Sequence, residues 1–400
     1  MQGQAPRILI RGVNWLGDAI MTTPALQRLR EAHPDSHITL LTHQKLADLW
    51  QGHPSINSVL TFGASETVSN IAHRLREQNF DSALVLPNSP RSALEVWLAR
   101  IPRRIGYARP WRNWFLTQVI PSRDHRIVMR KRSVAEVNRL IEDTQHATRN
   151  TTYPQRAHQL YEYLNLATTL GAGPTPAVPY IQIAPSELEP VATRFGLKPD
   201  PAEPFFGLNP GAEYGPAKRW PAERFISAAV EIQRQTRCRW LLFGGPPDLS
   251  IAQNIEMGIR NELAKTANAT LPVNLAGKTT LRELCVLLKL CRVLLTNDSG
   301  PMHVAAAVGT PVVVPFGSTS PELTGPGLPG DSRHQLLRAN APCSPCFLRA
   351  CPIDFRCMTG ISVERVVRGV IDATCNSPFA ASSRGLDTHV PGGHDPAPSE

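Results

Sequence analysis

The chain is 400 residues long, carries a formal net charge of +9 at pH 7 and contains eight cysteines. This length exceeds what a single hydrophobic core usually organises, so we expect two domains. No charged-then-apolar leader precedes the first apolar run, and no uncharged run is long enough to span a bilayer. These absences favour a cytoplasmic protein over a secreted or membrane-spanning one. Three cysteines lie singly in apolar segments and are expected in the core: Cys238, Cys285 and Cys291.

Strand and helix patterns alternate through the first part of the chain. Residues 7–11 are typical of a buried strand, residues 12–18 of a glycine-containing turn, and residues 19–32 of a helix. Further strands are expected at 38–41, 59–62 and 83–86, and further helices at 68–78, 92–99 and 156–170. Such alternation predicts a parallel α/β sheet, so residues 1–175 are assigned to a first Rossmann-like domain.

Five prolines between residues 171 and 190 mark the expected domain boundary, with a stiff linker at residues 176–185. The alternation restarts in residues 186–360, which are assigned to a second Rossmann-like domain. Its strands are expected at 205–208, 240–243, 273–275, 293–295 and 312–314, and its helices at 221–234, 249–263, 281–290 and 302–308. Past Asp331 the alternation of strand and helix patterns becomes weaker.

The end of the chain carries one more helical pattern. The helix in residues 361–375 is expected to pack across the domain junction, and residues 376–400, rich in Pro, Gly and Ser, are expected to be disordered. The predicted fold class is α/β, with two doubly wound domains that face each other. The carboxyl ends of both sheets then lie on one central cleft, where we expect the functional residues.

The segment from Asn297 to His303 follows a buried strand and enters a helix of small residues. The first free N–H groups of such a helix favour a phosphate, with Gly300 allowing close approach and Pro301 suiting the first turn. Asp298 beside the anion could hold neutral hydroxyl groups of whatever the phosphate is attached to. The alternative is an ordinary turn in which Asp298 or Ser299 is the helix N-cap.

A second glycine-rich turn, residues 209–221, ends in Lys218 and Arg219 just before a helix. Cations at a helix N-terminus conflict with the helix dipole, so both are candidate phosphate ligands; the alternative is that they are solvated loop cations. Further along, Gly244 and Asp248 follow the next strand. They could admit a base and contact ribose, although a plain turn explains them equally well.

Asp18 lies where the first glycine turn meets its helix, and it is either a helix cap or a general base for an incoming hydroxyl. The phosphate-type turns expected on the opposite wall favour the base. No Walker A loop, Gly-x-Ser-x-Gly elbow, His-Glu-x-x-His or Asp-x-Asp pair is present, which favours metal-independent chemistry.

Two clusters remain. Cys343, Cys346, Cys351 and Cys357 lie within fifteen residues, but their spacing is irregular for zinc, and free or redox-labile thiols are the favoured interpretation. Residues 100–132 concentrate arginines and contain two tryptophans. This basic stretch is either a solvated face or a surface for an acidic substrate, an anionic membrane or nucleic acid; no nucleic-acid-binding motif supports the last.

Five segments together resemble glycosyltransferase family 9, the heptosyltransferases of lipopolysaccharide core synthesis. They are RGVNWLGDAIMTTPAL at 11–26, NPGAEYGPAKRWP at 209–221, FGG at 243–245, LAGKTTLREL at 275–284 and LLTNDSGPMHVAAAVGTPVVVPFGSTSPELTGP at 294–326. The resemblance covers about residues 7–370. It implies the GT-B fold, with an acceptor on the first domain and ADP-heptose on the second.

The resemblance also implies roles for individual residues. Asp18 would be the general base, Lys218 would stabilise the diphosphate, and Asp298 would contact the heptose. The implied donor-binding residues are Asn209, Gly211, Ala212, Lys218, Arg219, Gly244, Asp248, Asp298, Ser299, Gly300, Pro301, Met302 and His303. The expected acceptor-binding residues are Asn14, Trp15, Gly17, Arg109, Arg112 and Arg123.

The expected reaction is inverting transfer of L-glycero-D-manno-heptose from ADP-heptose to the first heptose of heptosyl-Kdo2-lipid A, with no cofactor required. The acceptor would bring the protein to the cytoplasmic surface of the inner membrane. Family members that act earlier or later on the same core are the nearer alternative. A non-enzymatic nucleotide- or nucleic-acid-binding protein is the remote one, because it leaves Asp18 and Lys218 unexplained.

Overall fold

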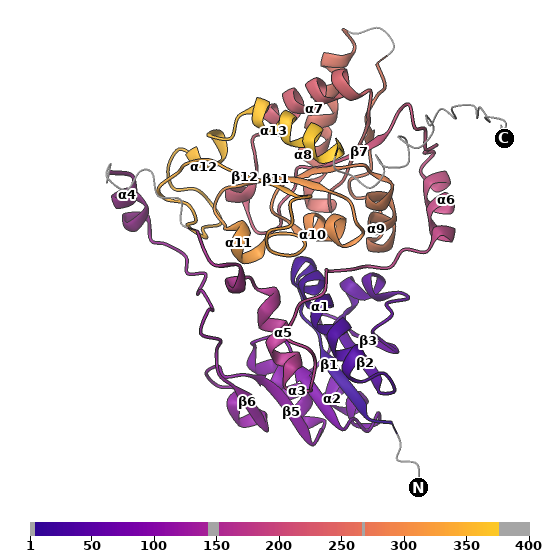
Figure 1. The fold of residues 1–400 in the computed structure, drawn as a ribbon, viewed down its shortest axis with the longest axis vertical. Coiled ribbons are helices and arrows are strands. Elements are labelled where there is room, and N and C mark those ends of the chain that lie inside the picture. The colour runs from indigo at the N-terminus through magenta and orange to yellow at the C-terminus, as the bar shows by residue number, and fades with distance from the viewer. Residues whose placement is uncertain (1–4, 143–151, 266–268, 376–400) are drawn as a thin grey trace, which may run out of the picture.

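The structure is a computed structural model that describes residues 5–142, 152–265 and 269–375. Its two domains each contain a six-stranded parallel sheet, one domain above the other in Figure 1. The expectation for residues 376–400 lies outside the described residues. Short 3-10 helices occur at η1 Gln44–Trp50, η2 Asn113–Phe115, η3 Gln155–Ala157, η4 Pro216–Lys218 and η5 Pro246–Asp248.

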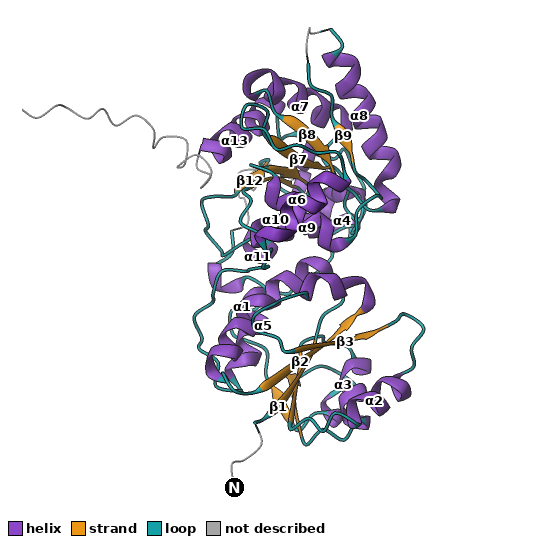
Figure 2. Ribbon diagram, turned by 90° about the vertical axis from the view of Figure 1, so that its right-hand side faces the viewer, coloured by secondary structure: helices purple, strands orange, loops and turns teal. Residues whose placement is uncertain are grey.

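The sheet of the first domain has the order β3-β2-β1-β4-β5-β6. Its strands are β1 Arg7–Arg11, β2 His37–His43, β3 Ser58–Phe62, β4 Ser82–Val85, β5 Arg103–Tyr107 and β6 Gln118–Ile120. Its helices are α1 Leu16–Ala32, α2 Val68–Arg76, α3 Pro90–Leu98 and α5 Leu160–Thr168. Figure 2 shows α1 and α5 on one face of the sheet and α2 and α3 on the other.

Alternation along the strands explains these two layers. On β1, Ile8 and Ile10 join the apolar cluster under α1 and α5, whereas Leu9 joins the cluster under α2 and α3. Successive strand side chains point to opposite faces, so a strand covered on both sides is apolar throughout. The strands expected at 38–41 and 83–86 are found as the mostly buried β2 and β4, and the one at 59–62 is found as the half-buried edge strand β3.

Two strands lie where only a basic surface was expected. Residues 100–132 contain β5 and β6, so this stretch completes the sheet as well as supplying charge. Arginines occupy the first two positions of β5, where the strand is still exposed or half-buried, and only Ile105 to Tyr107 are buried. The charged start conceals the strand in the sequence.

The sheet of the second domain has the order β12-β11-β10-β7-β8-β9. Its strands are β7 Phe205–Asn209, β8 Arg239–Leu242, β9 Val273–Asn274, β10 Leu294–Thr296, β11 Val312–Phe316 and β12 Gln335–Arg338. Its helices are α6 Pro185–Arg194, α7 Ala222–Thr236, α8 Leu249–Leu263, α9 Leu281–Leu290, α10 Gly300–Ala307, α11 Pro321–Thr324, α12 Arg356–Thr359 and α13 Val363–Cys375. All the expected strands are present, and the half-buried edge strand β12 was not expected.

The helix that crosses to the other domain is α4 Val134–Glu142 and not α13. The last helix packs on α7, β11 and β12 of its own domain, because its buried Val366 and Val370 belong to that domain's apolar cluster. Val137 of α4 joins the same cluster, and the Arg132 amide donates to the Cys346 carbonyl at 3.0 Å. Figure 1 shows α4 at the level of the second domain, away from β5 and β6 of the first. We therefore correct the expected crossing of residues 361–375.

The two domains share one apolar cluster across their junction. It runs from β1 and β2 through α1 and α5 to α9, α10 and β11. The first turns of α1 and α10 meet closely: a Cβ on Gly17 would lie 2.7 Å from His303, and one on Gly300 would lie 2.9 Å from Leu16. Two glycines thus bring the first turns of the two helices together.

Candidate active site

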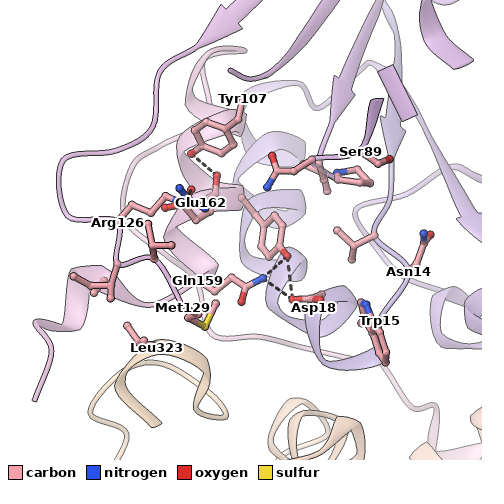
Figure 3. A pocket seen from close by; sticks show the side chains of 18 residues that line it. Asn14, Trp15, Asp18, Ser89, Tyr107, Arg126, Met129, Gln159, Glu162 and Leu323 are labelled. Carbon is pink, nitrogen blue, oxygen red and sulfur yellow. Dashed lines mark hydrogen bonds and ion pairs between the residues drawn. The ribbon is translucent and has the colours of Figure 1, made fainter. Parts of the chain in front are cut away.

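Asp18 lies in the first turn of α1, which begins at Leu16, earlier than expected. The N-cap of this helix is Trp15, so Asp18 does not act as the cap. Its Oδ1 accepts hydrogen bonds from Gln159 Nε2 at 2.6 Å and from the Tyr163 hydroxyl at 3.1 Å. Figure 3 shows Gln159 pointing at Asp18. The carboxylate is held by neutral donors on or just before α5.

Burial raises the pKa of Asp18 from its usual 3.8 to about 6. The Tyr163 hydrogen bond, the positive charge of Lys218 and the Gln159 hydrogen bond act in the opposite direction and lower it. A carboxyl with this pKa is mostly ionised at pH 7 and still basic enough to accept a proton in a transition state. Asp18 therefore has the electrostatics of a general base.

The opposite wall carries a buried ion pair. Lys218 Nζ lies 2.6 Å from Asp298 Oδ2, and the side chains are 13% and 5% exposed. The Thr319 hydroxyl donates to the same Asp298 oxygen. Lys218 also lies over the Tyr214 ring, 4.9 Å from its centroid. Asp298 is committed to these contacts, and neither it nor Ser299 caps α10 through its side chain.

Asp18 stands between two cavities. One, of about 470 Å³, lies within the first domain between the turns after β1 and β4, α5 and residues 126–129 (Figure 3). The other, of about 380 Å³, lies at the domain junction and contains the Lys218–Asp298 pair. Trp15, Asp18, Met129 and Gln159 line both cavities. A substrate in each cavity could therefore reach the same carboxylate.

Only part of the expected donor set lines the junction cavity: Lys218, Asp298, Ser299, Gly300 and His303. The others lie outside its lining: Asn209, Gly211, Ala212, Arg219, Gly244, Asp248, Pro301 and Met302. Asn209 is buried behind it and donates to the hydroxyls of Thr296 and Ser299 at 3.1 and 3.2 Å. Met302 is buried in the core.

Asp248 organises a separate cluster at the ends of β7 and β8. A Cβ on Gly211 or Gly244 would lie within 3 Å of its side chain, and Gly245 donates its N–H to Oδ2 at 3.1 Å. Arg219 approaches the same carboxylate at 3.5 Å. The glycines here admit Asp248 itself, which is a different use from the one the sequence suggested.

His303 is buried between the two helix starts. Burial lowers its pKa to about 4, against the opposing effect of Asp298, so the imidazole is neutral at pH 7. Its ring nitrogens can offer hydrogen bonds but no positive charge. The cationic side chain of the junction wall closest to Asp298 is Lys218.

The expected acceptor-binding residues also divide into those that line a cavity and those that do not. Asn14 and Trp15 line the cavity of the first domain, and Gly17 lines the junction cavity. Arg109, Arg112 and Arg123 line neither. Arg112 is fully buried and donates to the Pro87 carbonyl at 2.6 Å, and its burial lowers its pKa to about 10. It supports the turn after β4.

The other two arginines are also engaged. Arg123 pairs with Glu162 at 3.0 Å, and Arg109 donates to the Ala108 carbonyl and the Ser122 hydroxyl. The arginine that lines the first-domain cavity is Arg126. It belongs to the basic stretch, but the sequence alone does not distinguish it from its neighbours.

The sequence did not point to several residues of the site: Gln159, Tyr163, Tyr214, Thr319 and Arg349. Gln159 is the N-cap of α5 and Tyr163 lies four residues further along, on the helix. That spacing places them on one face, which was the available signal.

The four clustered cysteines are free thiols, of which Cys343, Cys346 and Cys357 are buried and Cys351 is half-buried. Within the described ranges, no group of three or more His, Cys, Asp or Glu side chains is arranged to hold a metal ion.

Residues 68–355 match the family model of glycosyltransferase family 9, described as heptosyltransferase. The chain is 31% identical to lipooligosaccharide heptosyltransferase 2 of Haemophilus ducreyi, an alignment that covers 80% of this chain and 86% of the relative. The chain belongs to glycosyltransferase family 9. This heptosyltransferase-family member is also 30% identical to lipopolysaccharide heptosyltransferase 2 of Escherichia coli K12, over 80% of this chain and 85% of the relative.

Solved structures support the family 9 assignment. The structure of Escherichia coli ADP-heptose LPS heptosyltransferase II superposes with a TM-score of 0.71 at 26% identity, covering 92% of this chain and 98% of that one. A family 9 glycosyltransferase from Veillonella parvula has the same TM-score at 24% identity, covering 94% and 99%, and shows the shared fold. The predicted α/β fold of two facing Rossmann-like domains is confirmed.

Proposed function

We propose that this glycosyltransferase transfers L-glycero-D-manno-heptose from ADP-heptose to the first heptose of the lipopolysaccharide inner core, with inversion. The observation that carries the proposal is the position of Asp18 between two cavities, one of which holds the Lys218–Asp298 pair. The names of the relatives, heptosyltransferase 2 in several bacteria, support the choice of donor and acceptor.

Asp18 is the proposed general base. Its Oδ1 accepts two hydrogen bonds, while Oδ2 has no hydrogen-bond partner within the described part of the chain. Oδ2 is therefore the oxygen that takes the proton from the acceptor hydroxyl as that hydroxyl attacks the anomeric carbon. The bond from that carbon to the ADP oxygen breaks on the other side, so one displacement inverts the configuration.

Lys218 is the proposed stabiliser of the departing diphosphate, and the N-terminus of α10 supplies backbone N–H groups beside it. One well-placed donor to developing charge contributes about 3–4 kcal/mol. Asp298 keeps the ammonium in position through its 2.6 Å contact and lies where heptose hydroxyls would enter the cavity. These groups supply the charge that a metal ion provides in other transferases, and we propose that no cofactor is required.

The cavity of the first domain is the proposed acceptor site. Beside its wall, Arg112 ties the loop of Trp111 and Trp114 to Pro87. These two tryptophans are 85% and 89% exposed. Residues 90–121 contain five arginines that are exposed or half-buried, besides the buried Arg112, and their one glutamate is buried. A basic surface with exposed tryptophans suits an anionic bilayer, so we propose peripheral association with the cytoplasmic face of the inner membrane. No helix among the described residues has the length and apolarity to cross one.

The decisive experiment is mass-spectrometric detection of heptose transfer from ADP-heptose to defined acceptors. Kdo2-lipid A and its monoheptosylated form should be offered in parallel, and product should form only with the second. Product from Kdo2-lipid A alone would assign an earlier step of core synthesis, and no transfer to either acceptor would contradict the proposal.

Membrane association is tested by sedimentation with vesicles of anionic phospholipid. Replacing Trp111 and Trp114 together by Ser should reduce the bound fraction several-fold. Met257 and Leu271, exposed apolar residues of the second domain, provide the matched double replacement and should leave binding unchanged. Equal losses in both variants would contradict a specific contact surface.

A further inference from the structure

The proposed function leaves the cysteine loop, residues 343–357, without a role, yet this loop lies against the lysine turn. The Arg349 carbonyl accepts the Ala217 N–H at 2.9 Å, and the Tyr214 hydroxyl donates to the Phe347 carbonyl at 2.7 Å. Gly215 has φ +151°, and a Cβ there would lie 2.5 Å from the Arg349 oxygen. The close approach requires glycine at this position. The loop therefore supports the segment that presents Lys218.

The cysteine loop is itself firmly anchored. Cys343, Cys346 and Cys357 belong to the apolar cluster of the second domain. Burial raises the pKa of the Cys357 thiol to about 12, so this group is uncharged and packs as a small apolar side chain. The Ser344 hydroxyl donates to the Gly317 carbonyl and the Phe347 N–H to the Ser318 carbonyl, each at 2.7 Å. The backbone that carries Arg349 is thus fixed to the end of β11.

Arg349 is an exposed residue on this fixed backbone and lines the junction cavity. Its guanidinium lies 5.3 Å from the centroid of the Tyr214 ring, and the Lys218 ammonium lies 4.9 Å from the same centroid. Two cations therefore share one aromatic ring at the cavity wall. They differ in their partners, because Lys218 is paired with Asp298, whereas Arg349 has no ion pair or side-chain hydrogen bond among the residues that the structure describes.

We propose that Arg349 is a second cationic ligand of the donor diphosphate, brought into the cavity by the cysteine loop. This inference rests on the proposed function. The planar guanidinium offers paired N–H donors that match two phosphate oxygens, and the Tyr214 ring fixes its plane. Lys218 supplies a compact charge from the neighbouring turn. The buried cysteines of the loop then hold Arg349 in place as apolar packing groups.

The test is isothermal titration of the full-length protein with ADP and with AMP, at two salt concentrations. Arg349→Ala should weaken ADP binding about 10- to 100-fold and reduce its salt dependence, because charge-assisted contacts to phosphate are lost. AMP, with one phosphate fewer, should be affected less. Arg349→Gln keeps a planar amide over Tyr214 without the charge, so it should lose ADP affinity while retaining the wild-type melting temperature.

Arg356→Ala is the matched control, because Arg356 lies in the same loop and, among the described residues, its side chain pairs only with Asp354, at 2.7 Å on the surface. It should bind ADP like the wild type. Unchanged ADP affinity in both Arg349 variants would overturn the inference, as would equal losses for ADP and AMP, which would indicate a displaced lysine turn. Failure of the wild type to bind ADP would instead contradict the proposed function.

Discussion

The two walls of the cleft hold their charged groups by opposite means. On the first domain, the Asp18 carboxylate accepts hydrogen bonds from the neutral groups of Gln159 and Tyr163. On the second domain, Lys218 and Asp298 form an ion pair. Neutral donors leave a carboxylate free to gain and lose a proton, whereas an ion pair keeps both partners charged. The first arrangement suits a group that exchanges a proton, and the second suits groups that stay charged.

Among changes to the first domain's side of the cleft, Asp18→Asn is expected to reduce activity the most. The amide cannot accept a proton, so kcat should fall about 100- to 10,000-fold while the KM for ADP-heptose stays near its wild-type value. Steady-state kinetics with both substrates measures this. Near-normal turnover would contradict the assignment of the base.

The same variant should be more stable than the wild type at pH 7. Folding raises the pKa of Asp18 from 3.8 to about 6, so the folded chain binds this proton more tightly than the unfolded chain. The wild type therefore loses stability as the pH rises from about 4 to about 6, and a neutral amide avoids that loss. Thermal unfolding at pH 4 and pH 7 should show a difference that appears only at the higher pH.

On the second domain's side of the cleft, Lys218→Ala removes the cation of the ion pair with Asp298. Loss of the ammonium should lower kcat about 100- to 1,000-fold and also weaken ADP binding. The replacement leaves Asp298 buried without its ion pair, so some loss of stability is expected. Lys218→Ala combined with Asp298→Asn should recover stability but not activity. Recovery of both would show that the lysine is structural.

Gly17→Ala tests the close contact between the first turns of α1 and α10, where the two domains meet. The added methyl would lie 2.7 Å from His303, so the first turns of α1 and α10 must separate. We expect kcat to fall about 10-fold or more, since small misplacements of reacting groups are costly. Gly63→Ala is the control, because its nearest neighbour would be 4.0 Å away, and it should be silent.

Of these variants, Tyr163→Phe is expected to change activity the least. The Tyr163 hydrogen bond lowers the pKa of Asp18, so its removal should raise that pKa above about 6. The acid limb of the kcat profile should then shift to higher pH, with little change at pH 8. A uniform loss of activity at every pH would indicate a structural role instead.

Other titratable and charged groups line the two cavities with Asp18. They are Arg126, Glu162, Glu213, Tyr214, Lys218, Asp298, His303 and Arg349, together with Tyr107 and Tyr163. Only Lys218 and Tyr163 act on the Asp18 pKa among these, besides the burial that dominates it. Tyr163→Phe and the wild type differ in one of these groups, which isolates its contribution.

Sequence patterns were sufficient where local apolar periodicity decides the structure. Val312 to Val314 could only be a strand covered on both faces, and β11 is buried throughout. They were insufficient for β5 and β12, whose arginines and half-buried positions hide the strand. They also misplaced the crossing helix, because the apolar faces of α4 and α13 do not reveal which domain they cover.

The same contrast holds for the site. Asp18, Lys218 and Asp298 were found because each follows a strand, and the carboxyl ends of parallel strands meet at one edge of the sheet. Their roles remain predictions. Gln159 and Tyr163 were missed because they reach Asp18 from 141 and 145 residues away, a contact that only the packing of α5 on α1 creates. The sequence did not reveal that Arg112 is buried, because no local pattern distinguishes a buried arginine from an exposed one.

The segment beside the base has one further consequence. Gln159 reaches Asp18 with its side chain, while its backbone N–H donates to Leu323 of the second domain at 2.9 Å, and His158 contacts the Gly325 carbonyl at 3.0 Å. Separation of the domains must therefore strain the same short segment that holds the carboxylate. The hydrogen bond that orients the Asp18 carboxylate is therefore tied to the contact between the two domains.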